Sequence, residues 1–211
     1  MSEPAESGRS ARKRQAIIDA ARTVFLSKGY GGASMDDVAA LAAVSKQTVY
    51  KHFADKKRLF TSVITGDIGA TEALTHNIVA ALRDSETIEE DLRRFARRHI
   101  TEVTQPDLIR LRRIIIAEAE RFPELARIWY ASGPEHAHET LADQFQALAR
   151  RGLLRVDDAL LAAQHFNWLI LSIPLNRAMF NGGETVFAPG ELERYADEGV
   201  RVFLAAYGPP P

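Results

Sequence analysis

The side chains of this chain with the clearest chemical potential stand between residues 46 and 52. Lysine and protonated histidine bind phosphate, glutamine and threonine read base edges, and tyrosine contacts phosphate or the methyl group of thymine. The residues of these types are Lys46, Gln47, Thr48, Tyr50, Lys51 and His52. Their types and their density predict a surface that contacts duplex DNA.

Two short helices joined by a tight turn are predicted to hold these side chains. Ser34, with Asp37 three residues later, caps the first helix, and Ser45 caps the second. Val49 and Phe53 point inward from the second helix, which leaves its polar residues facing solvent. This pattern predicts a helix-turn-helix, whose second helix enters the major groove. The spacing alone is equally compatible with an ordinary helical hairpin that has a solvated polar face.

The charge distribution favours the DNA-binding interpretation. Residues 1–60 contain eleven Lys and Arg against six Asp and Glu, a net charge of +5, whereas the remainder contains sixteen against twenty-two, a net charge of −6. A basic stretch including Arg12 and Lys13 precedes the first amphipathic helix, and Lys56 and Lys57 follow a cap at Asp55. Cations in a first helical turn oppose the helix dipole, so we interpret them as phosphate contacts.

The run from about Arg12 to Phe60 resembles the DNA-binding domain of the TetR/AcrR family of bacterial transcription regulators. The matching elements, in order, are IxxAAxxVF at 17–25, KGY at 28–30, SMDDVA at 34–39, AVS at 43–45, TVYKHF at 48–53 and DKKRLF at 55–60. The expected DNA-contacting set is Arg12, Lys13, Ser34, Ser45, Lys46, Gln47, Thr48, Tyr50, Lys51, His52, Lys56 and Lys57.

Two positions depart from the family pattern. Ala43 stands where the turn usually carries glycine. Because a left-handed alanine costs about 1 kcal/mol, it favours a turn that is not left-handed. Gln47 also stands where glycine is frequent, and it is a candidate specificity residue because glutamine makes bidentate contacts with adenine.

Composition bounds the remaining possibilities. The 211 residues are 46% hydrophobic and 26% charged, which fits one or two globular domains, and they include no cysteine, which excludes disulfides and thiolate chemistry. We find no membrane-spanning run and no signal peptide, and expect a cytoplasmic protein. The predicted division is a disordered arm over 1–10, a helix-turn-helix domain over 11–56, a helical regulatory and dimerisation domain over 57–207, and a tail over 208–211.

The body reads as helix throughout, so the predicted fold class is all-α: an N-terminal three-helix bundle with the helix-turn-helix, plus a larger C-terminal helical domain for ligand binding and dimerisation. A long helix is expected after Asp55, a capping box at Thr87, and a helix beginning at Pro106. Pro174 is expected to kink or divide the most apolar helix, 159–180.

Residues 105–182 resemble the AefR-like ligand-binding domain of a TetR subgroup, through IIIAEAERFPELA at 114–126, GP at 133–134 and AAQHF at 162–166. The resemblance implies dimerisation through the last two long helices, which form a four-helix bundle. The sequence is compatible, because residues 168–173 place apolar side chains around their helix, beyond what one buried stripe needs.

Candidate ligand contacts are polar residues on apolar helices and aromatic residues that line a pocket. The candidates are Arg113, Glu118, Phe122, Trp129, Tyr130, Phe145, His165, Trp168 and Asn176. For each aromatic residue, the core or a dimer interface is the stronger interpretation, and a salt bridge is the stronger one for Glu118. His136 and His138 do not share a helical face, so we expect no metal site, and we expect no cofactor.

The leading hypothesis is a homodimeric transcription regulator, most often a repressor in this family, that binds a palindromic operator and is released by a small-molecule effector. A helical-bundle enzyme is the second class, and we find no catalytic constellation for it. A purely architectural DNA binder is the third. Ligand-dependent loss of DNA affinity separates the first hypothesis from the third.

Overall fold

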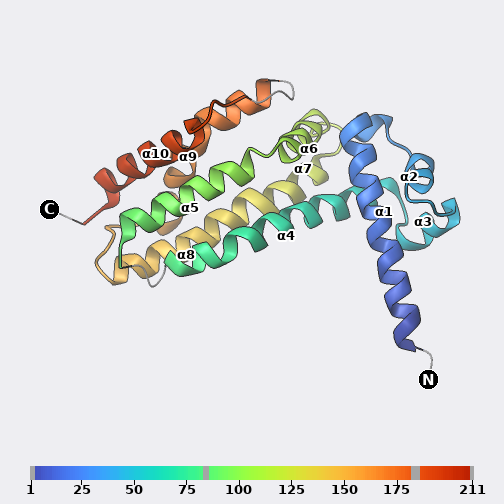
Figure 1. Ribbon diagram of the computed structural model, residues 1–211, viewed down its shortest axis with the longest axis horizontal. Helices are drawn as coiled ribbons and strands as arrows, with labels where there is room; N and C mark the ends of the chain where they lie inside the picture. The colour runs from blue at the N-terminus through green and yellow to red at the C-terminus, as the bar shows by residue number, and fades with distance from the viewer. Residues whose placement is uncertain (1–2, 83–85, 182–185, 210–211) are drawn as a thin grey trace. The chain divides into compact units, whose positions relative to one another are not determined.

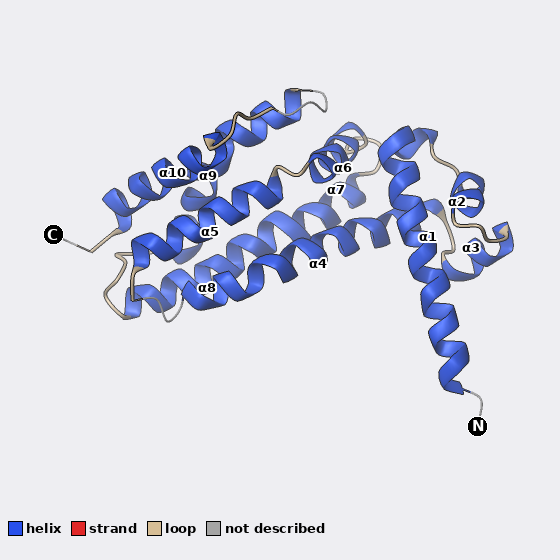
Figure 2. Cartoon of the chain, viewed as in Figure 1, coloured by secondary structure: helices blue, strands red, loops and turns tan. Residues whose placement is uncertain are grey.

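The computed structural model describes residues 3–82, 86–181 and 186–209, and every regular element in these ranges is a helix (Figure 2). The all-α class predicted from the sequence is therefore confirmed. The chain forms two compact units. Unit 1 comprises Met1–Asp67 and Leu111–Trp129, and unit 2 comprises Ile68–Arg110 and Tyr130–Pro211.

Unit 1 begins with the helix α1, Glu3–Gly32, followed by α2, Met35–Leu41, and α3, Lys46–His52 (Figure 1). The sequence predicts a disordered arm over 1–10, whereas the structure is helical from Glu3. Ala5, Glu6, Ala11 and Arg12 are strong helix formers, and α1 extends N-terminally through them.

The helices α1, α2 and α3, together called the head, share an apolar core with the start of α4, Lys56–Leu82. The largest contributions come from residues that are at most 5% exposed: Ile17, Val24, Phe25, Val38, Val49, Phe53, Leu59 and Phe60. The Phe25 and Phe60 rings meet edge to face with centroids 4.7 Å apart, a favourable aromatic geometry. The long helix predicted after Asp55 is confirmed by α4.

Unit 1 also contains most of α6, Pro106–Ala117, and α7, Pro123–Tyr130. The Phe122 ring packs edge to face on Tyr30 of α1 at a centroid distance of 4.8 Å, and Lys57 Nζ lies 2.6 Å from Glu124 Oε1. These contacts explain why unit 1 extends beyond the predicted 11–56 domain. Neither contact is visible in local sequence, since each joins residues more than sixty positions apart.

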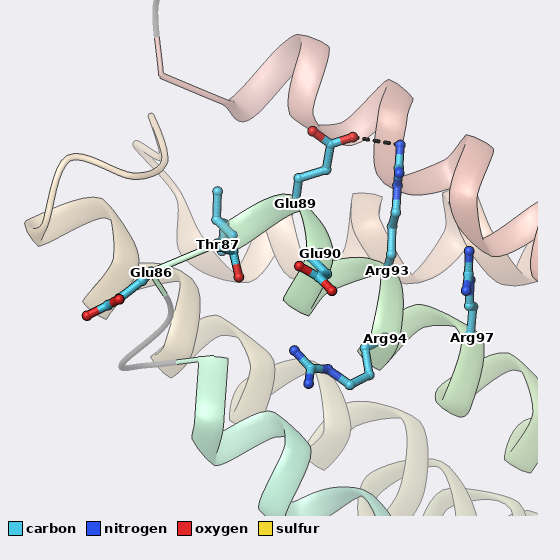
Figure 3. Close-up of a pocket in the computed structure, with 8 residues that line it drawn as sticks. Glu86, Thr87, Glu89, Glu90, Arg93, Arg94 and Arg97 are labelled. Carbon is cyan, nitrogen blue, oxygen red and sulfur yellow. Dashed lines mark ion pairs between the residues drawn. The ribbon is translucent and has the colours of Figure 1, made fainter.

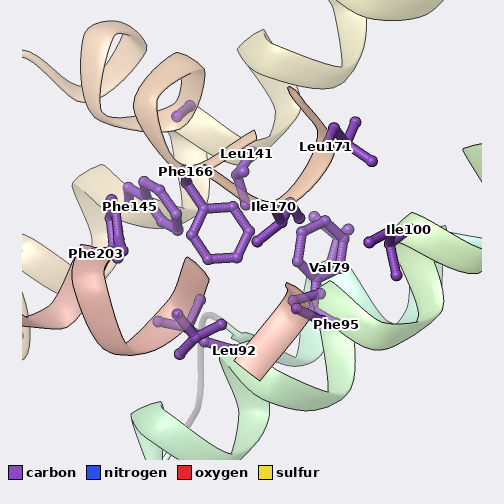
Figure 4. Packing of buried hydrophobic residues seen from close by; sticks show 14 of the residues in the cluster. Val79, Leu92, Phe95, Ile100, Leu141, Phe145, Phe166, Ile170, Leu171 and Phe203 are labelled. Atoms are coloured by element: carbon purple, nitrogen blue, oxygen red, sulfur yellow. The ribbon is translucent and has the colours of Figure 1, made fainter. Parts of the chain in front are cut away.

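Unit 2 consists of the rest of α4 with α5, Ile88–Val103, a π-helical turn, Ala131–Glu135, α8, His136–Arg150, α9, Ala159–Phe180, and α10, Glu191–Tyr207. The α9 helix packs between α8 and α10, and α10 packs on α5. Their shared core centres on Phe145, Phe166 and Phe203, each fully buried (Figure 4). This core fixes which residues of each helix face inward.

One local prediction for the body is wrong, and of the two outcomes expected at Pro174, a kink or a division, the division does not occur. Thr87 precedes α5 but forms no side-chain capping bond, because its ψ of 69° lies outside the extended region in which a capping oxygen reaches the first turn. Pro174 does not divide α9, which is continuous from Ala159 to Phe180. Pro174 and its neighbour Leu175 are buried in the unit 2 core, and this packing holds the helix together across the missing donor.

Candidate nucleic-acid interface and effector contacts

The α2 helix starts with the capping box predicted from the sequence. Asp37 N donates to Ser34 Oγ and Ser34 N donates to Asp37 Oδ2, both at 3.1 Å. Lys28 of α1 adds an ion pair to Asp37 at 2.8 Å. The hydrogen bonds from Lys28 and Ser34 lower the pKa of the Asp37 carboxyl. The start of α2 is thereby tied to α1. This orients the two helices that precede α3, which is called the reading helix because it carries the predicted base contacts.

The turn between α2 and α3 is left-handed at Ala43, where φ is +52°. Ala43 N donates to Ala40 O at 3.3 Å and Val44 N donates to Ala39 O at 3.1 Å. These are the two hydrogen bonds of a Schellman motif, which satisfies the free carbonyls at a helix end. The expectation that alanine avoids this conformation is therefore wrong. The two hydrogen bonds offset the local cost of a left-handed alanine.

The α3 helix presents its polar residues as predicted. Ser45 caps it, accepting from Thr48 N at 3.2 Å. Val49 and Phe53 are buried, at 0% and 3% exposed, and anchor the opposite side. Lys46, Gln47, Tyr50 and Lys51 are exposed, whereas Thr48 and His52 are half-buried. The result is a short rigid helix with a polar face open to solvent.

Several cations of the predicted set already have partners. Lys46 Nζ lies 2.8 Å from Asp36 Oδ1, and this carboxylate raises the pKa of Lys46. Lys56 Nζ donates to Tyr30 O and Ala33 O, both at 2.9 Å, and therefore fastens α4 to the end of α1. Lys57 pairs with Glu124. Lys46 and Lys57 each have one carboxylate partner and remain exposed, whereas Lys56 is half-buried and already donates to two carbonyl groups.

Other members of the set are open to solvent. Arg12 and Lys13 are exposed on α1, and Ser34 and Ser45 are exposed at their cap positions. Within the described part of the chain, Gln47 and Lys51 form no side-chain hydrogen bond or ion pair. These two residues can therefore contact a nucleic acid without breaking an existing interaction.

The predicted ligand contacts are divided between the two units. Arg113, Glu118, Phe122 and Trp129 belong to unit 1, where Phe122 packs on Tyr30. Phe145 is fully buried in the core of unit 2, and Tyr130 is 51% exposed. His165, Trp168 and Asn176 all lie exposed on α9, and His165 Nδ1 is 2.6 Å from the Tyr207 hydroxyl. Each of these helices has a buried side and an exposed side, so the type of a residue alone did not predict whether it lies in the core or at the surface.

A pair of polar side chains lies inside unit 2. His99 of α5 places Nε2 3.0 Å from Asn167 Oδ1 of α9, and its ring stacks on Phe95 with centroids 5.4 Å apart. Burial lowers the pKa of His99, against the hydrogen bond to Asn167, and the nearby His138 lowers it further. Burial also lowers the pKa of His138, which is 4% exposed. Both imidazoles are therefore neutral at pH 7.

An open hollow of about 940 Å³ lies at the start of α5 in unit 2 (Figure 3). Its three arginines already have carboxylate partners. Arg93 pairs with Glu89, Arg94 with Asp91 and Arg97 with Asp197. The hollow therefore has a compensated charge, and none of the predicted ligand contacts lines it. In the described ranges, no cluster of three or more metal-ligating side chains occurs.

Comparison with known proteins identifies the arrangement. Residues 17–63 match the family described as bacterial regulatory proteins, tetR family. Residues 90–209, more than half of the chain, match the AefR-like transcriptional repressor C-terminal domain. The chain belongs to the TetR family. This TetR-family protein is accordingly a DNA-binding transcription regulator with a ligand-binding C-terminal domain, and not an enzyme.

Several relatives resemble this TetR-family protein over its whole length. The crystal structure of a TetR-family regulator from Mesorhizobium loti MAFF303099 is 44% identical, with a TM-score of 0.90, and the match covers 95% of this chain and 98% of that one. The flavonoid-responsive regulator FrrA is 30% identical, with a TM-score of 0.75, and the match covers 95% of this chain and all of FrrA, 100%.

Curated relatives match this chain over shorter stretches. The activator FasR of Mycolicibacterium smegmatis is 35% identical over 85 residues, 40% of this chain and 37% of FasR. The repressor BepR of Brucella suis is 38% identical over 55 residues, 26% of each chain. This TetR-family protein thus spans well under half the length of these curated relatives. The names include both an activator and a repressor.

Proposed function

We propose that the protein is a homodimeric repressor that binds a palindromic operator and is released from it by a small-molecule inducer. The observation that carries the proposal is the exposed polar face of α3, held by the Ser45 cap and the buried Val49. An α3 helix with this face is suited to lie in the major groove, with Gln47 at base edges and Lys51 at phosphate.

The apolar surface of α9 supports a dimer. Six of its large apolar residues are exposed, by fractions from 40% to 86%: Leu160, Leu161, Trp168, Leu169, Ile173 and Phe180. Val202 adds a further exposed apolar residue on α10, at 42%. Large exposed apolar area on a helix favours an interaction surface. We propose that α9 and α10 of a second copy cover it and form a four-helix bundle.

A two-fold dimer implies a palindromic operator. Each copy presents one α3 helix, and the symmetry of the pair is matched by two inverted half-sites. The half-sites are separated by about one helical turn of DNA or a multiple of it. The α4 helix starts in unit 1 and ends in unit 2, so it is the proposed connection through which effector binding reaches the reading helix.

The inducer acts by a population shift. A ligand that binds the DNA-incompetent state more tightly than the competent one lowers operator affinity, and it does so only by that difference in affinity. FrrA responds to flavonoids, as its name states, and resembles this chain over nearly its full length. Aromatic compounds are therefore the first class of effector to test. In the described residues, no helix is long and apolar enough to cross a bilayer, and we propose a cytoplasmic location.

The decisive experiment is a fluorescence anisotropy titration of the full chain against the DNA upstream of its own gene, with random duplex of equal length as the control. We expect tighter binding to the upstream DNA, with affinity that falls as salt rises. A panel of aromatic acids, phenols and drugs is then added to the complex. Equal affinity for both duplexes contradicts the proposed sequence-specific DNA binding. Specific binding that no compound releases contradicts the proposed release by an inducer of these classes.

A further inference from the structure

Two hydrogen-bond donors are buried without partners where α6 meets α7. The guanidinium carbon of Arg112 lies 4.5 Å from the centre of the Trp129 ring, so the two side chains are in direct contact. Arg112 Nε and Trp129 Nε1 are both buried, and neither has a hydrogen-bond partner in the structure. A buried donor that forms no hydrogen bond costs free energy, so a pair of them in contact requires an explanation.

The charge of Arg112 is also uncompensated. Burial lowers the pKa of Arg112 to about 10, whereas the ion pair with Asp197 raises the pKa of Arg97 and the one with Glu191 raises that of Arg177. Among the described side chains, no carboxylate forms an ion pair with Arg112. A buried cation is normally paired, because removing it from water is costly. An anion from outside the chain is one partner that this half-buried guanidinium could take.

We propose that Arg112 and Trp129 bind the anionic group of the effector, which is a small organic acid with an apolar body. The guanidinium offers charge-assisted hydrogen bonds to a carboxylate or phenolate, and the indole N–H offers another donor. The same two helices carry buried apolar residues, Ile115 at 4% and Leu125 at 2% exposed. This inference rests on the proposed ligand-responsive function, and it names the chemistry of the ligand.

The location suits a regulatory site. Arg112 and Trp129 belong to unit 1, the same compact unit as the reading helix α3. The segment between them includes Phe122, on Tyr30 of α1, and Glu124, on Lys57 at the start of α4. An anion that changes the packing of α6 on α7 therefore acts on contacts made with α1 and α4. In this way a bound acid influences the orientation of the head's helices.

The test measures whether the protein distinguishes an acid from its neutral amide. Octanoate, 4-phenylbutyrate and 2-naphthoate are each titrated into the full chain by calorimetry, beside octanamide, 4-phenylbutyramide and 2-naphthamide. We expect at least one acid to bind about tenfold or more tightly than its amide, the effect of a charge-assisted hydrogen bond. In a Trp168→Phe background, octanoate is expected to change the emission of Trp129, the remaining tryptophan.

Substitutions of Arg112 test whether this residue causes the preference for an acid over its amide. Arg112→Gln is expected to abolish the preference for the acid, and Arg112→Lys to retain part of it because the charge remains. Arg121→Gln is the matched control, since Arg121 is an exposed arginine 5.1 Å from the Phe122 ring in the same unit, and it is expected to leave the preference unchanged. Without any acid, Arg112→Gln is expected to keep or raise the melting temperature, because it removes an uncompensated charge.

The outcomes separate this proposal from the proposed function. If the protein prefers its own upstream DNA but binds all three acids no more tightly than their amides, the anion site is wrong and the regulator stands. If an acid binds through Arg112 but the protein shows no preference for its upstream DNA, the regulator is wrong and the site stands. An Arg112→Gln protein that keeps the full preference for the acid overturns the proposal, because the preference then does not depend on the Arg112 charge.

Discussion

Ala43 adopts a backbone conformation that favours glycine, with φ at +52° in the turn before the reading helix. A left-handed alanine costs about 1 kcal/mol or more, whereas glycine adopts this conformation freely. The side chain is exposed, so its removal loses little packing. We predict that Ala43→Gly raises the free energy of unfolding of the head by about 0.5–1 kcal/mol after the higher entropy of the unfolded glycine is included.

Urea unfolding followed by circular dichroism measures this effect. Ala42→Gly is the matched control, because Ala42 is right-handed with φ at −75°. It is expected to lower stability by up to about 1 kcal/mol, the usual cost of glycine at a helical position. Destabilisation by both variants would show that the Ala43 methyl group contributes packing that outweighs the strain.

Gln47 and Lys51 are both exposed on α3 but are predicted to serve different purposes. Gln47→Ala is expected to relax preference at one base pair of each half-site by roughly 1–3 kcal/mol, because a bidentate contact to adenine is lost. Lys51→Ala is expected to weaken all duplexes similarly and to reduce the salt slope by about one unit. Anisotropy titrations against a set of single-base operator variants distinguish them. An unchanged specificity profile for Gln47→Ala excludes it as a base reader.

At the scale of elements, α9 and α10 approach closely at Gly199. A Cβ added there meets Ile170 Cγ2 at 2.5 Å and the Ile170 Cα and N atoms at 3.3 Å. Both residues are fully inside the unit 2 core, so the helices must separate to accept a methyl group. We predict that Gly199→Ala lowers the free energy of unfolding of the body by about 1–3 kcal/mol.

Thermal and urea unfolding test the α9–α10 prediction. Gly66→Ala on α4 is the control, because a Cβ there meets nothing within 4 Å. It is expected to stabilise its helix by up to about 1 kcal/mol, as alanine replaces glycine in a helix interior. Equal stability of the two variants would contradict the close approach at Gly199.

The helices α5, α8 and α9 enclose two neutral imidazoles, which makes the body sensitive to acid. Burial lowers the pKa of His99 and His138 below the ordinary value of 6.5. Below that value the unfolded chain binds more protons than the folded one, so the free energy of unfolding falls as the pH falls towards the folded pKa values. Above about pH 6.5 both states are neutral, and this contribution to the pH dependence vanishes.

Unfolding between pH 7.5 and 5.5 measures this slope. His138→Gln is expected to flatten it, and His136→Gln, which changes an exposed histidine two residues away, is the matched control. Both histidines belong to unit 2, so the slope reports the stability of unit 2 rather than that of the unit that holds α3. Identical slopes for the parent protein and His138→Gln would show that His138 does not titrate between the two states.

At the scale of the whole molecule, we expect operator affinity to depend on the exposed face of α9, because dimerisation through that face joins two DNA-binding heads. Ile173 is 55% exposed on that face, and Ile173→Glu places a charge where the second copy is proposed to pack. We predict a monomer in sedimentation experiments and a fall in operator affinity of about a hundredfold, because two linked heads bind far more tightly than one.

The control for dimerisation is Ile116→Glu, which changes an isoleucine that is 60% exposed on α6. It is expected to leave the sedimentation behaviour unchanged, since α6 is outside the proposed interface. A dimeric Ile173→Glu protein with full operator affinity would show that the copies associate through another surface.

The sequence by itself determined the family, the all-α class and the helix-turn-helix. These depend on local patterns: the capping residues Ser34 and Ser45, the inward Val49 and Phe53, and the periodic apolar positions of the body. Such signals involve residues only a few positions apart, so they can be recognised in the sequence itself. The same local logic failed at Thr87, which forms no capping bond, and Pro174 does not divide α9.

Only the tertiary structure decided which polar groups meet. Lys56 binds carbonyl oxygens 26 and 23 residues earlier in the chain, and His99 reaches Asn167 over 68 residues. The sequence shows that Arg112 lies in an arginine-rich helical segment. It does not show the contact of Arg112 with Trp129, nor that Arg112 Nε has no hydrogen-bond partner. Contacts of this kind depend on how helices rotate and pack around a shared core. That rotation is a property of the whole set of helices, which no short segment encodes.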